Sequence, residues 1–163
     1  MSQGHRTRSP TAGYRTVVKI LVCWVKAGGK TSAALQELTA EYCKRIRAYN
    51  SGIELAEFRD EERMLQAADK MGGRLVLLDS RGKQFSSEQF ANFMRDNQDS
   101  AASQLTFGIG PHDGFSERVR GSAHLLLSLG AMTLPHEVAR VVLLEQIYRA
   151  YTILKGHPYH LGH

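Results

Sequence analysis

The chain has 163 residues, with 42% hydrophobic and 23% charged side chains and a formal net charge of +5. This is the composition of one globular domain rather than of a disordered or fibrous chain. Its apolar runs are shorter than a membrane span and are interrupted by arginine or glutamate, so no membrane partner is expected.

The two cysteines, Cys23 and Cys43, are too few for a disulfide scaffold or a metal cluster. Cys23 lies within the apolar run KILVCWV and is expected to be a small core residue. A reducing compartment, the cytoplasm, is therefore the expected location.

The positive charge is concentrated at the start of the chain. Residues 1–15 are predicted to form a basic extension, either a solvated flexible leader or an arm that follows a phosphate backbone. An organelle transit peptide is a further alternative. Residues 16–163 are predicted to form the single folded domain. Residues 1–36 hold no acidic side chain and six basic ones, namely Arg6, Arg8, Arg15, Lys19, Lys26 and Lys30.

The first half of the domain alternates between strand and helix patterns. The β-branched run 16–25 predicts a buried strand, and the amphipathic period over 31–49 predicts a helix. A short strand over 53–58 is followed by a helix over 60–71, which Gly72-Gly73 ends. The apolar segment 74–79 predicts the third strand.

The second half continues the alternation. Residues 86–97 open with Ser-x-x-Gln, the pattern of a capping box, and predict a helix. A strand over 104–110, a short helix over 115–120 and a last strand over 124–130 follow. The run 135–155 predicts the final helix.

This order of elements predicts an α/β protein, a three-layer α/β/α sandwich with a mostly parallel sheet and helices on both faces. In such sheets ligands bind at the carboxyl ends of the strands. Three turns at that edge are therefore candidate binding segments: those after Leu78-Asp79, after Ile109-Gly110, and across Gly130–Leu134.

The glycine-bearing turns do not fit a nucleotide fingerprint. Lys26–Lys30 has neither G-x-G-x-x-G nor the P-loop order, so an NAD enzyme or an NTPase is not expected. The segment FGIGPHDGF allows backbone to approach a ligand closely at Gly110. His112 and Asp113 within it form either an acid/base pair or a turn with a helix cap.

The turn GAMTL is small and apolar. A polar cofactor loop would carry Asp, Asn or Ser, whereas an apolar turn fits a flat heteroaromatic ring whose edge is read by backbone groups. Adenine is the commonest ring of this kind.

The final helix is apolar on nearly every side, with charges embedded among the apolar residues. Such a helix is expected to be buried against its own sheet and against a second surface, for which another copy of the chain is a candidate. Glu145 and Arg149 lie one turn apart, and they form either a structural ion pair or a pair that orients substrate.

The segment His157-Pro158-Tyr159-His160 follows this helix with polar and aromatic groups. These side chains can stack on bases, donate hydrogen bonds and exchange protons near neutral pH. Histidines 157, 160 and 163 have no cysteine or carboxylate nearby in the sequence, so no metal site is expected.

Together these motifs resemble one family. The stretch LSLGAMTLPHEVARVVLLEQIYRAYTILKGHPYH, with LLD and FGIGPHDG before it, is similar to the RlmH family of the SPOUT superfamily, the ribosomal RNA large-subunit (pseudouridine-N3) methyltransferases. The similarity covers about residues 16–160 and is densest over 125–160. The combination of TLPH, R-V-x-L-x-E-Q-x-Y-R-A and HPYH is what makes it specific.

The resemblance implies a domain with a deep trefoil knot near its C-terminal end, acting as a homodimer on the large-subunit rRNA of the assembled ribosome. It also implies S-adenosylmethionine as the methyl donor, bound among the knot turns. The cofactor-binding positions that it implies are Leu78, Gly110, Leu129, Gly130, Ala131, Met132, Thr133 and Leu134.

Two positions inside the motifs depart from the family pattern. Pro111 replaces the second glycine of the I-G-G turn, which removes a backbone N–H and restricts φ. Gly130 stands where relatives often have serine. The basic extension also lies outside the resemblance.

Methyl transfer to N3 of a pseudouridine requires alignment and removal of the N3 proton. His160 is the candidate base, Tyr159 a stacking or hydrogen-bonding partner, Arg149 the group that meets negative charge, and Glu145 its support. Two alternatives remain: a non-catalytic ribosome- or RNA-binding protein with the same fold, and a knotted tRNA methyltransferase.

Overall fold

The structure is a computed structural model that describes residues 18–49, 51–100 and 104–161, with the backbone alone at 160 and 161. The predicted extension 1–15 lies outside the described residues. The elements in chain order are β1 (Lys19–Val25), α1 (Ala33–Arg47), β2 (Gly52–Phe58), α2 (Glu61–Met71), β3 (Arg74–Gln84), α3 (Ser87–Gln98), β4 (Gln104–Ile109), α4 (Glu117–Gly121), β5 (Leu125–Ser128), α5 (His136–Leu154) and a 3-10 turn η1 (Pro158–Leu161).

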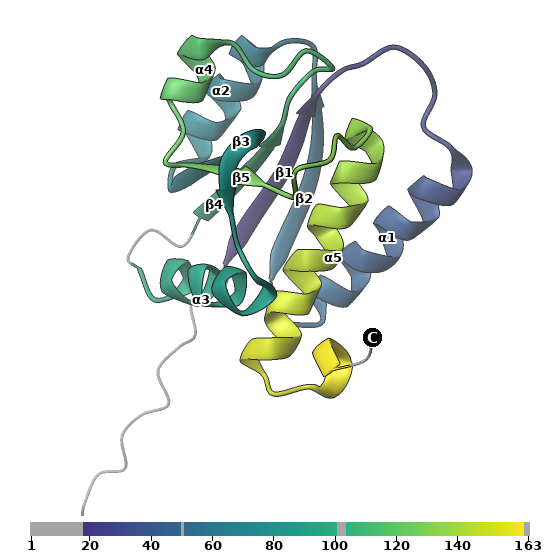
Figure 1. The fold of residues 1–163 in the computed structure, drawn as a ribbon, viewed down its shortest axis with the longest axis vertical. Helices are drawn as coiled ribbons and strands as arrows, with labels where there is room; N and C mark the ends of the chain where they lie inside the picture. The colour runs from purple at the N-terminus through teal and green to yellow at the C-terminus, as the bar shows by residue number, and fades with distance from the viewer. Residues whose placement is uncertain (1–17, 50, 101–103, 162–163) are drawn as a thin grey trace, which may run out of the picture.

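The five described strands form one sheet in the order β2-β1-β4-β3-β5, and every neighbouring pair is parallel. The sheet is therefore parallel throughout the described residues, where the sequence predicted a mostly parallel one. Helices α1, α3 and α5 pack on one face of the sheet, and α2 and α4 pack on the other. Figure 1 shows these layers, and they confirm the predicted α/β class.

Each face of the sheet has its own apolar core. The larger core includes Ile20, Phe107 and Leu143, and the smaller one includes Cys23 and Leu77. Strands buried on both faces read as continuous apolar runs, which is why the sequence revealed them without alternation. Cys23 is fully buried, and burial raises the pKa of its thiol to about 12. The predicted role of Cys23 as a core residue is confirmed.

Side-chain caps begin four of the helices. The hydroxyls of Ser32, Ser86 and Ser116 and the carboxylate of Asp60 each accept a hydrogen bond from a backbone N–H of the first helical turn. Ser86 also forms the predicted capping box with Gln89. The caps fix where each helix begins, and thus where the preceding strand-end turn must stop.

Strand β3 is longer than its sequence predicted. The prediction ended it at Asp79, whereas the strand continues to Gln84 with an irregularity at which Leu78 and Lys83 both pair with Leu127 of β5. Residues between them cross close to β5. A Cβ on Gly82 would lie 2.5 Å from the carbonyl oxygen of Leu126, so only glycine fits this crossing.

Helix α5 lies between α1 and α3 on the larger core. Leu143, Leu144, Ile147 and Tyr151 are buried in the larger core, as expected for a helix predicted to pack against its own sheet. Arg140 is also buried, and its guanidinium carbon lies 3.5 Å from the ring centroid of Trp24. Within the described part of the chain, no helix is both long and apolar enough to cross a membrane.

Candidate functional site

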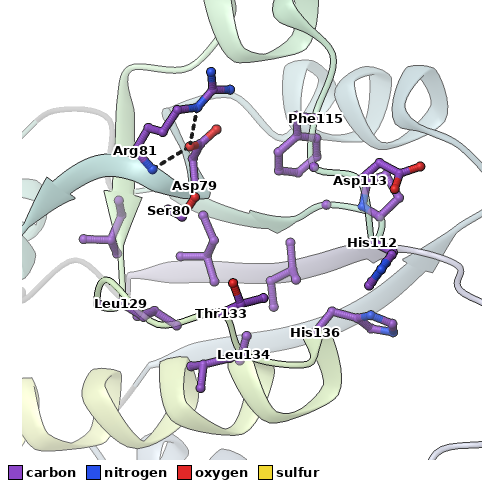
Figure 2. Close-up of a pocket in the computed structure, with 18 of the residues that line it drawn as sticks. Asp79, Ser80, Arg81, His112, Asp113, Phe115, Leu129, Thr133, Leu134 and His136 are labelled. Atoms are coloured by element: carbon purple, nitrogen blue, oxygen red, sulfur yellow. Dashed lines mark hydrogen bonds and ion pairs between the residues drawn. The ribbon is translucent and has the colours of Figure 1, made fainter.

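A cavity of about 420 Å³ lies at the carboxyl edge of the sheet. Its walls are residues 78–81 within β3, the turns that follow β4 and β5, and the first turn of α5. Figure 2 shows labelled side chains from all four segments arranged around it. The three segments chosen from the sequence are thus brought to one place, as the rule for parallel sheets predicts, although the one after Leu78-Asp79 is part of β3 and not a turn.

Seven of the eight predicted cofactor-binding residues line this cavity. Ala131 does not, although both of its chain neighbours do. Cofactor binding by these residues stays a prediction. The seven are Leu78, Gly110, Leu129, Gly130, Met132, Thr133 and Leu134.

The turn after β5 is held in shape by Ser128. Its hydroxyl accepts a hydrogen bond from the N–H of Gly130 at 3.2 Å and donates one to the Gly130 carbonyl at 2.9 Å. Gly130 has a φ of +147°, a conformation that glycine adopts without strain. Met132 is 83% exposed and Leu134 is 37% exposed, so this turn presents apolar side chains at the rim of the cavity.

The turn after β4 is closed by the backbone. The N–H of Gly114 donates to the carbonyl of Pro111 at 2.8 Å, so Pro111 is accommodated in the turn without its N–H. His112 and Asp113 both line the cavity. A backbone hydrogen bond thus closes this turn, and Ser116 rather than Asp113 caps the helix that follows.

Asp79 is a lining residue that the sequence analysis did not select. Its carboxylate lies 2.7 Å from Nε of Arg120 and accepts the backbone N–H of Arg81 at 2.8 Å. Burial alone would raise the pKa of Asp79, but these two donors outweigh burial and hold the pKa below its usual value. Its place directly after a strand was a usable signal, whereas its partner Arg120 comes from α4 and could not be paired with it from sequence.

We expect Asp79→Asn to lower the free energy of unfolding by about 2 kcal/mol at pH 7, because a nearly buried charge-assisted pair is lost. The folded-state pKa of Asp79 lies below the unfolded value of about 3.9, so its contribution is complete above that pH and is lost as the pH falls through the folded-state pKa. Thermal unfolding of both proteins between pH 7 and pH 2 measures this. The control is Asp69→Asn at an exposed position on α2, where no change is expected.

A second group of predicted residues gathers at the far end of α5. Glu145 Oε1 lies 3.0 Å from Nε of Arg149 and 2.5 Å from Nη2 of the same guanidinium. The hydroxyl of Tyr159 donates to the same Glu145 oxygen at 3.2 Å, and the Arg149 guanidinium lies 5.2 Å from the Tyr159 ring centroid. The structure therefore brings together three of the four predicted catalytic residues.

Tyr159 stays a neutral phenol in this group. Burial is the main cause that raises its pKa, and hydrogen bonds to Tyr42 and Glu145 raise it further. Its ring meets the ring of Tyr148 edge to face at 4.7 Å. The Arg149 guanidinium, whose pKa is raised by its hydrogen bond to Glu145, stays charged.

The fourth predicted residue, His160, lies in η1, but its side chain is outside the described residues. The turn before it is ordered by local contacts. Thr152 accepts the backbone N–H of His157 at 2.9 Å, and His157 Nδ1 accepts the N–H of Tyr159 at 3.1 Å. These contacts fold the segment back onto the end of α5 (Figure 1).

Glu145, Arg149 and Tyr159 together are called the Tyr159 group. The cavity lies at the N-terminal end of α5, whereas the Tyr159 group lies toward the other end. Ala139 lines the cavity, and Arg149 is roughly 15 Å further along the axis at 1.5 Å per residue. Within a single chain, as far as the structure describes it, the cavity and the Tyr159 group are therefore not in contact. Among the residues that the structure describes, no three His, Cys, Asp or Glu side chains are grouped to hold a metal ion.

The arrangement defines a class: an α/β protein with a parallel sheet and a cavity at the carboxyl edge of that sheet. Comparisons with known proteins are more specific. A family model described as "Predicted SPOUT methyltransferase" matches residues 18–160. The chain belongs to this family, which confirms the resemblance seen in its motifs.

Two curated relatives of this chain share the name ribosomal RNA large subunit methyltransferase H. The relative from Koribacter versatilis is 49% identical and aligns over 90% of this chain and 100% of its own length. The relative from Geotalea daltonii is 41% identical over 88% of this chain and 99% of its own length. A solved structure from Haemophilus influenzae Rd KW20, described as a probable methylase family protein, has a TM-score of 0.50 at 9% identity and covers 87% of this chain and 68% of its own.

Proposed function

We propose that this chain transfers a methyl group from S-adenosylmethionine to N3 of a pseudouridine in large-subunit ribosomal RNA. The observation that carries the proposal is the cavity lined by residues 78–81 of β3 and by the turns after β4 and β5. The names of the relatives support ribosomal RNA as the substrate. The location that follows is the cytoplasm, where ribosomes are assembled.

The residues around the cavity fit S-adenosylmethionine. The cavity volume of about 420 Å³ lies within the range of about 300–1,000 Å³ that is usual for small-molecule and cofactor pockets. Gly110 and Phe115 lie side by side in the wall of the cavity, and a Cβ on Gly110 would lie 3.1 Å from the Phe115 ring. The wall is therefore too tight at this point for a side chain on residue 110. Leu129, Thr133 and Leu134 would face the adenine, and the Asp113 carboxylate would meet the positive end of the cofactor.

When bound, S-adenosylmethionine supplies an electrophilic methyl group on a sulfonium. The chain must position N3 in line with it and lower the cost of removing the N3 proton. Arg149 faces the negative charge that develops on the imide, Glu145 fixes the orientation of Arg149, and Tyr159 contacts the base. His160 is the proposed acceptor of the N3 proton.

We propose a homodimer because the cavity and the Tyr159 group are separated along α5 within one chain. In a dimer the Tyr159 group of one copy would face the cavity of the other. The apolar rim also supports a second copy, since Met132 and Leu134 are exposed beside the cavity in a single chain.

We also propose that residues 16–163 form one domain with a trefoil knot near its C-terminal end, preceded by the basic extension 1–15. The close crossing of Gly82 over Leu126 supports the knot, because it brings the segment after Leu78 tightly across β5. The assembled ribosome is the proposed substrate. A compact domain without an RNA-binding appendage is expected to have little activity on naked rRNA.

The test is methylation of ribosomes from cells that lack this protein, followed by mass spectrometry of the rRNA. We expect a gain of one methyl group on a single pseudouridine with assembled ribosomes, and little gain with naked rRNA or tRNA. Binding of S-adenosylmethionine without any methyl transfer to these RNAs would contradict the proposed reaction and favour the non-catalytic alternative. Methylation of tRNA instead would favour the other alternative.

Gly110→Val is expected to weaken S-adenosylmethionine binding about tenfold or more, because the added side chain occupies the cavity beside Phe115. Titration calorimetry measures the affinity, and circular dichroism shows whether the fold is retained. The matched control is Gly28→Val, where a Cβ meets nothing within 4 Å and no change in affinity is expected. Equal affinity for the Gly110 variant and the wild type would place the cofactor elsewhere.

A further inference from the structure

Five tyrosines gather where the ends of α1 and α5 meet η1. The rings of Tyr42 and Tyr148 have centroids 6.2 Å apart, and those of Tyr49 and Tyr151 are stacked at 5.7 Å. Tyr148 contacts Tyr159, the residue assigned to the substrate side of the site. The α1 side chains in this cluster are therefore continuous with the Tyr159 group, although the proposed function gives them no role.

Arg45 of α1 lies against this cluster. Its guanidinium carbon is 5.5 Å from the ring centroid of Tyr42 and 5.5 Å from that of Tyr148. The side chain remains 41% exposed. Two rings thus hold the guanidinium from the protein side and limit its rotamers, while part of it faces solvent.

The ion pair of Arg45 does not block a ligand. Its Nε lies 3.0 Å from Glu41 one helical turn earlier, and the Glu41 side chain is 49% exposed. Exposed pairs at this spacing contribute only about 0.3–0.5 kcal/mol. A phosphate group can therefore replace or share this contact at small cost, because arginine presents a fork of N–H donors that matches phosphate oxygens.

A second cation lies on the same aromatic group. Arg149 is positioned over Tyr159, and Tyr159 in turn meets Tyr148 beside Arg45. Other described cation–ring contacts are local to their own elements or buried: Lys83 over Phe85 and Arg140 over Trp24. Two arginines fixed on one set of rings suit a nucleotide whose base and phosphate need separate contacts.

Resting on the proposed function, we propose that Arg45 is an RNA-binding residue that contacts a backbone phosphate next to the nucleotide received by Arg149 and Tyr159. Tyr42 is a positioning residue in this arrangement. It supports the Arg45 guanidinium with its ring and hydrogen-bonds the Tyr159 hydroxyl. Helix α1 thereby extends the substrate side of the site beyond α5 and η1.

The experiment measures ribosome affinity at several salt concentrations for the wild type, Arg45→Ala and Arg45→Lys. One lost phosphate contact is expected to weaken binding about fivefold for Arg45→Ala and to reduce the slope of log K against log salt by about one. Arg45→Lys keeps the charge, so its slope should match the wild type. The affinity for S-adenosylmethionine should not change in either variant.

The matched control is Arg63→Ala, which removes an exposed arginine of an ion pair on α2, on the other face of the sheet. Its affinity and salt slope should equal those of the wild type. An Arg45→Ala variant with the wild-type salt slope would overturn the proposal. This holds even if its affinity fell, because loss of a phosphate contact must reduce the slope. The binding assay needs no methyl transfer, so a wild type that binds ribosomes without methylating them would overturn only the proposed reaction.

Tyr42→Phe tests whether Tyr42 positions Arg45 and Tyr159 rather than contacting RNA itself. The ring stays under Arg45, so the salt slope should be unchanged, while the lost hydroxyl should lower kcat about threefold with little change in KM. A fall in ribosome affinity equal to that of Arg45→Ala would contradict the positioning role.

Discussion

Arg149→Ala is expected to reduce the rate of rRNA methylation by a factor of about 100 to 1,000, the usual effect of removing a fixed group that meets developing charge. Arg149 is suited to this role by its surroundings. Glu145 holds two of its nitrogens, and the Tyr159 ring lies beside its guanidinium. Single-turnover methylation of ribosomes measures the effect without interference from product release.

Comparison with Arg149→Lys distinguishes charge from geometry. Lysine keeps the charge but cannot place two nitrogens in fixed geometry on the one Glu145 oxygen, so we expect a partial loss of about tenfold. Arg95→Ala on α3 is the control, because it removes an exposed arginine whose ion pair is with Asp96 of its own helix, and it should leave the rate unchanged. A wild-type rate for Arg149→Ala would limit the Glu145–Arg149 contact to a structural ion pair.

All ten helices and strands predicted from the sequence are present, because each carried a local signal. Buried parallel strands read as continuous apolar runs, and Ser or Asp caps mark helix starts such as those of α2 and α3. The end of β3 could not be predicted. Lys83 and Gln84 have no apolar pattern, and they join the strand only because β5 lies beside them in the fold.

The candidate site was predictable to the same extent. The carboxyl-edge rule chose three segments that the structure gathers around one cavity, two of them turns and one part of β3, and helix spacing paired Glu145 with Arg149. The sequence did not reveal Arg120 beside Asp79, or Tyr42 and Arg45 beside Tyr148. These contacts join elements distant in the chain, and no local period encodes them.

The separation of the two residue groups is itself a structural result. A sequence motif that ends in HPYH suggests one site, whereas the fold places its two halves at opposite ends of α5. The same helix therefore positions both groups without bringing them together. This geometry favours a reaction centre shared between two copies, which is why cofactor binding and methyl transfer should respond to different substitutions.

Gly82→Ala is expected to lower the free energy of unfolding by about 3 kcal/mol and the Tm by roughly 6–12 °C. The added Cβ would lie 2.5 Å from the Leu126 carbonyl oxygen and 2.8 Å from the Leu127 nitrogen. Both atoms belong to the backbone of a paired strand, so neither can rotate away as a side chain would. Relief requires β3 and β5 to separate.

That separation should also affect the cavity, because the β3 residues just before Gly82 form one of its walls. We therefore expect Gly82→Ala to weaken S-adenosylmethionine binding as well as stability. Gly121→Ala in α4 is the matched control, since its Cβ meets nothing within 4 Å and alanine favours the helix, which should raise stability by up to about 1 kcal/mol. Thermal unfolding and calorimetry of both variants measure the two effects, and a Gly82→Ala protein with the wild-type Tm would show that β3 and β5 do not cross as closely as the structure places them.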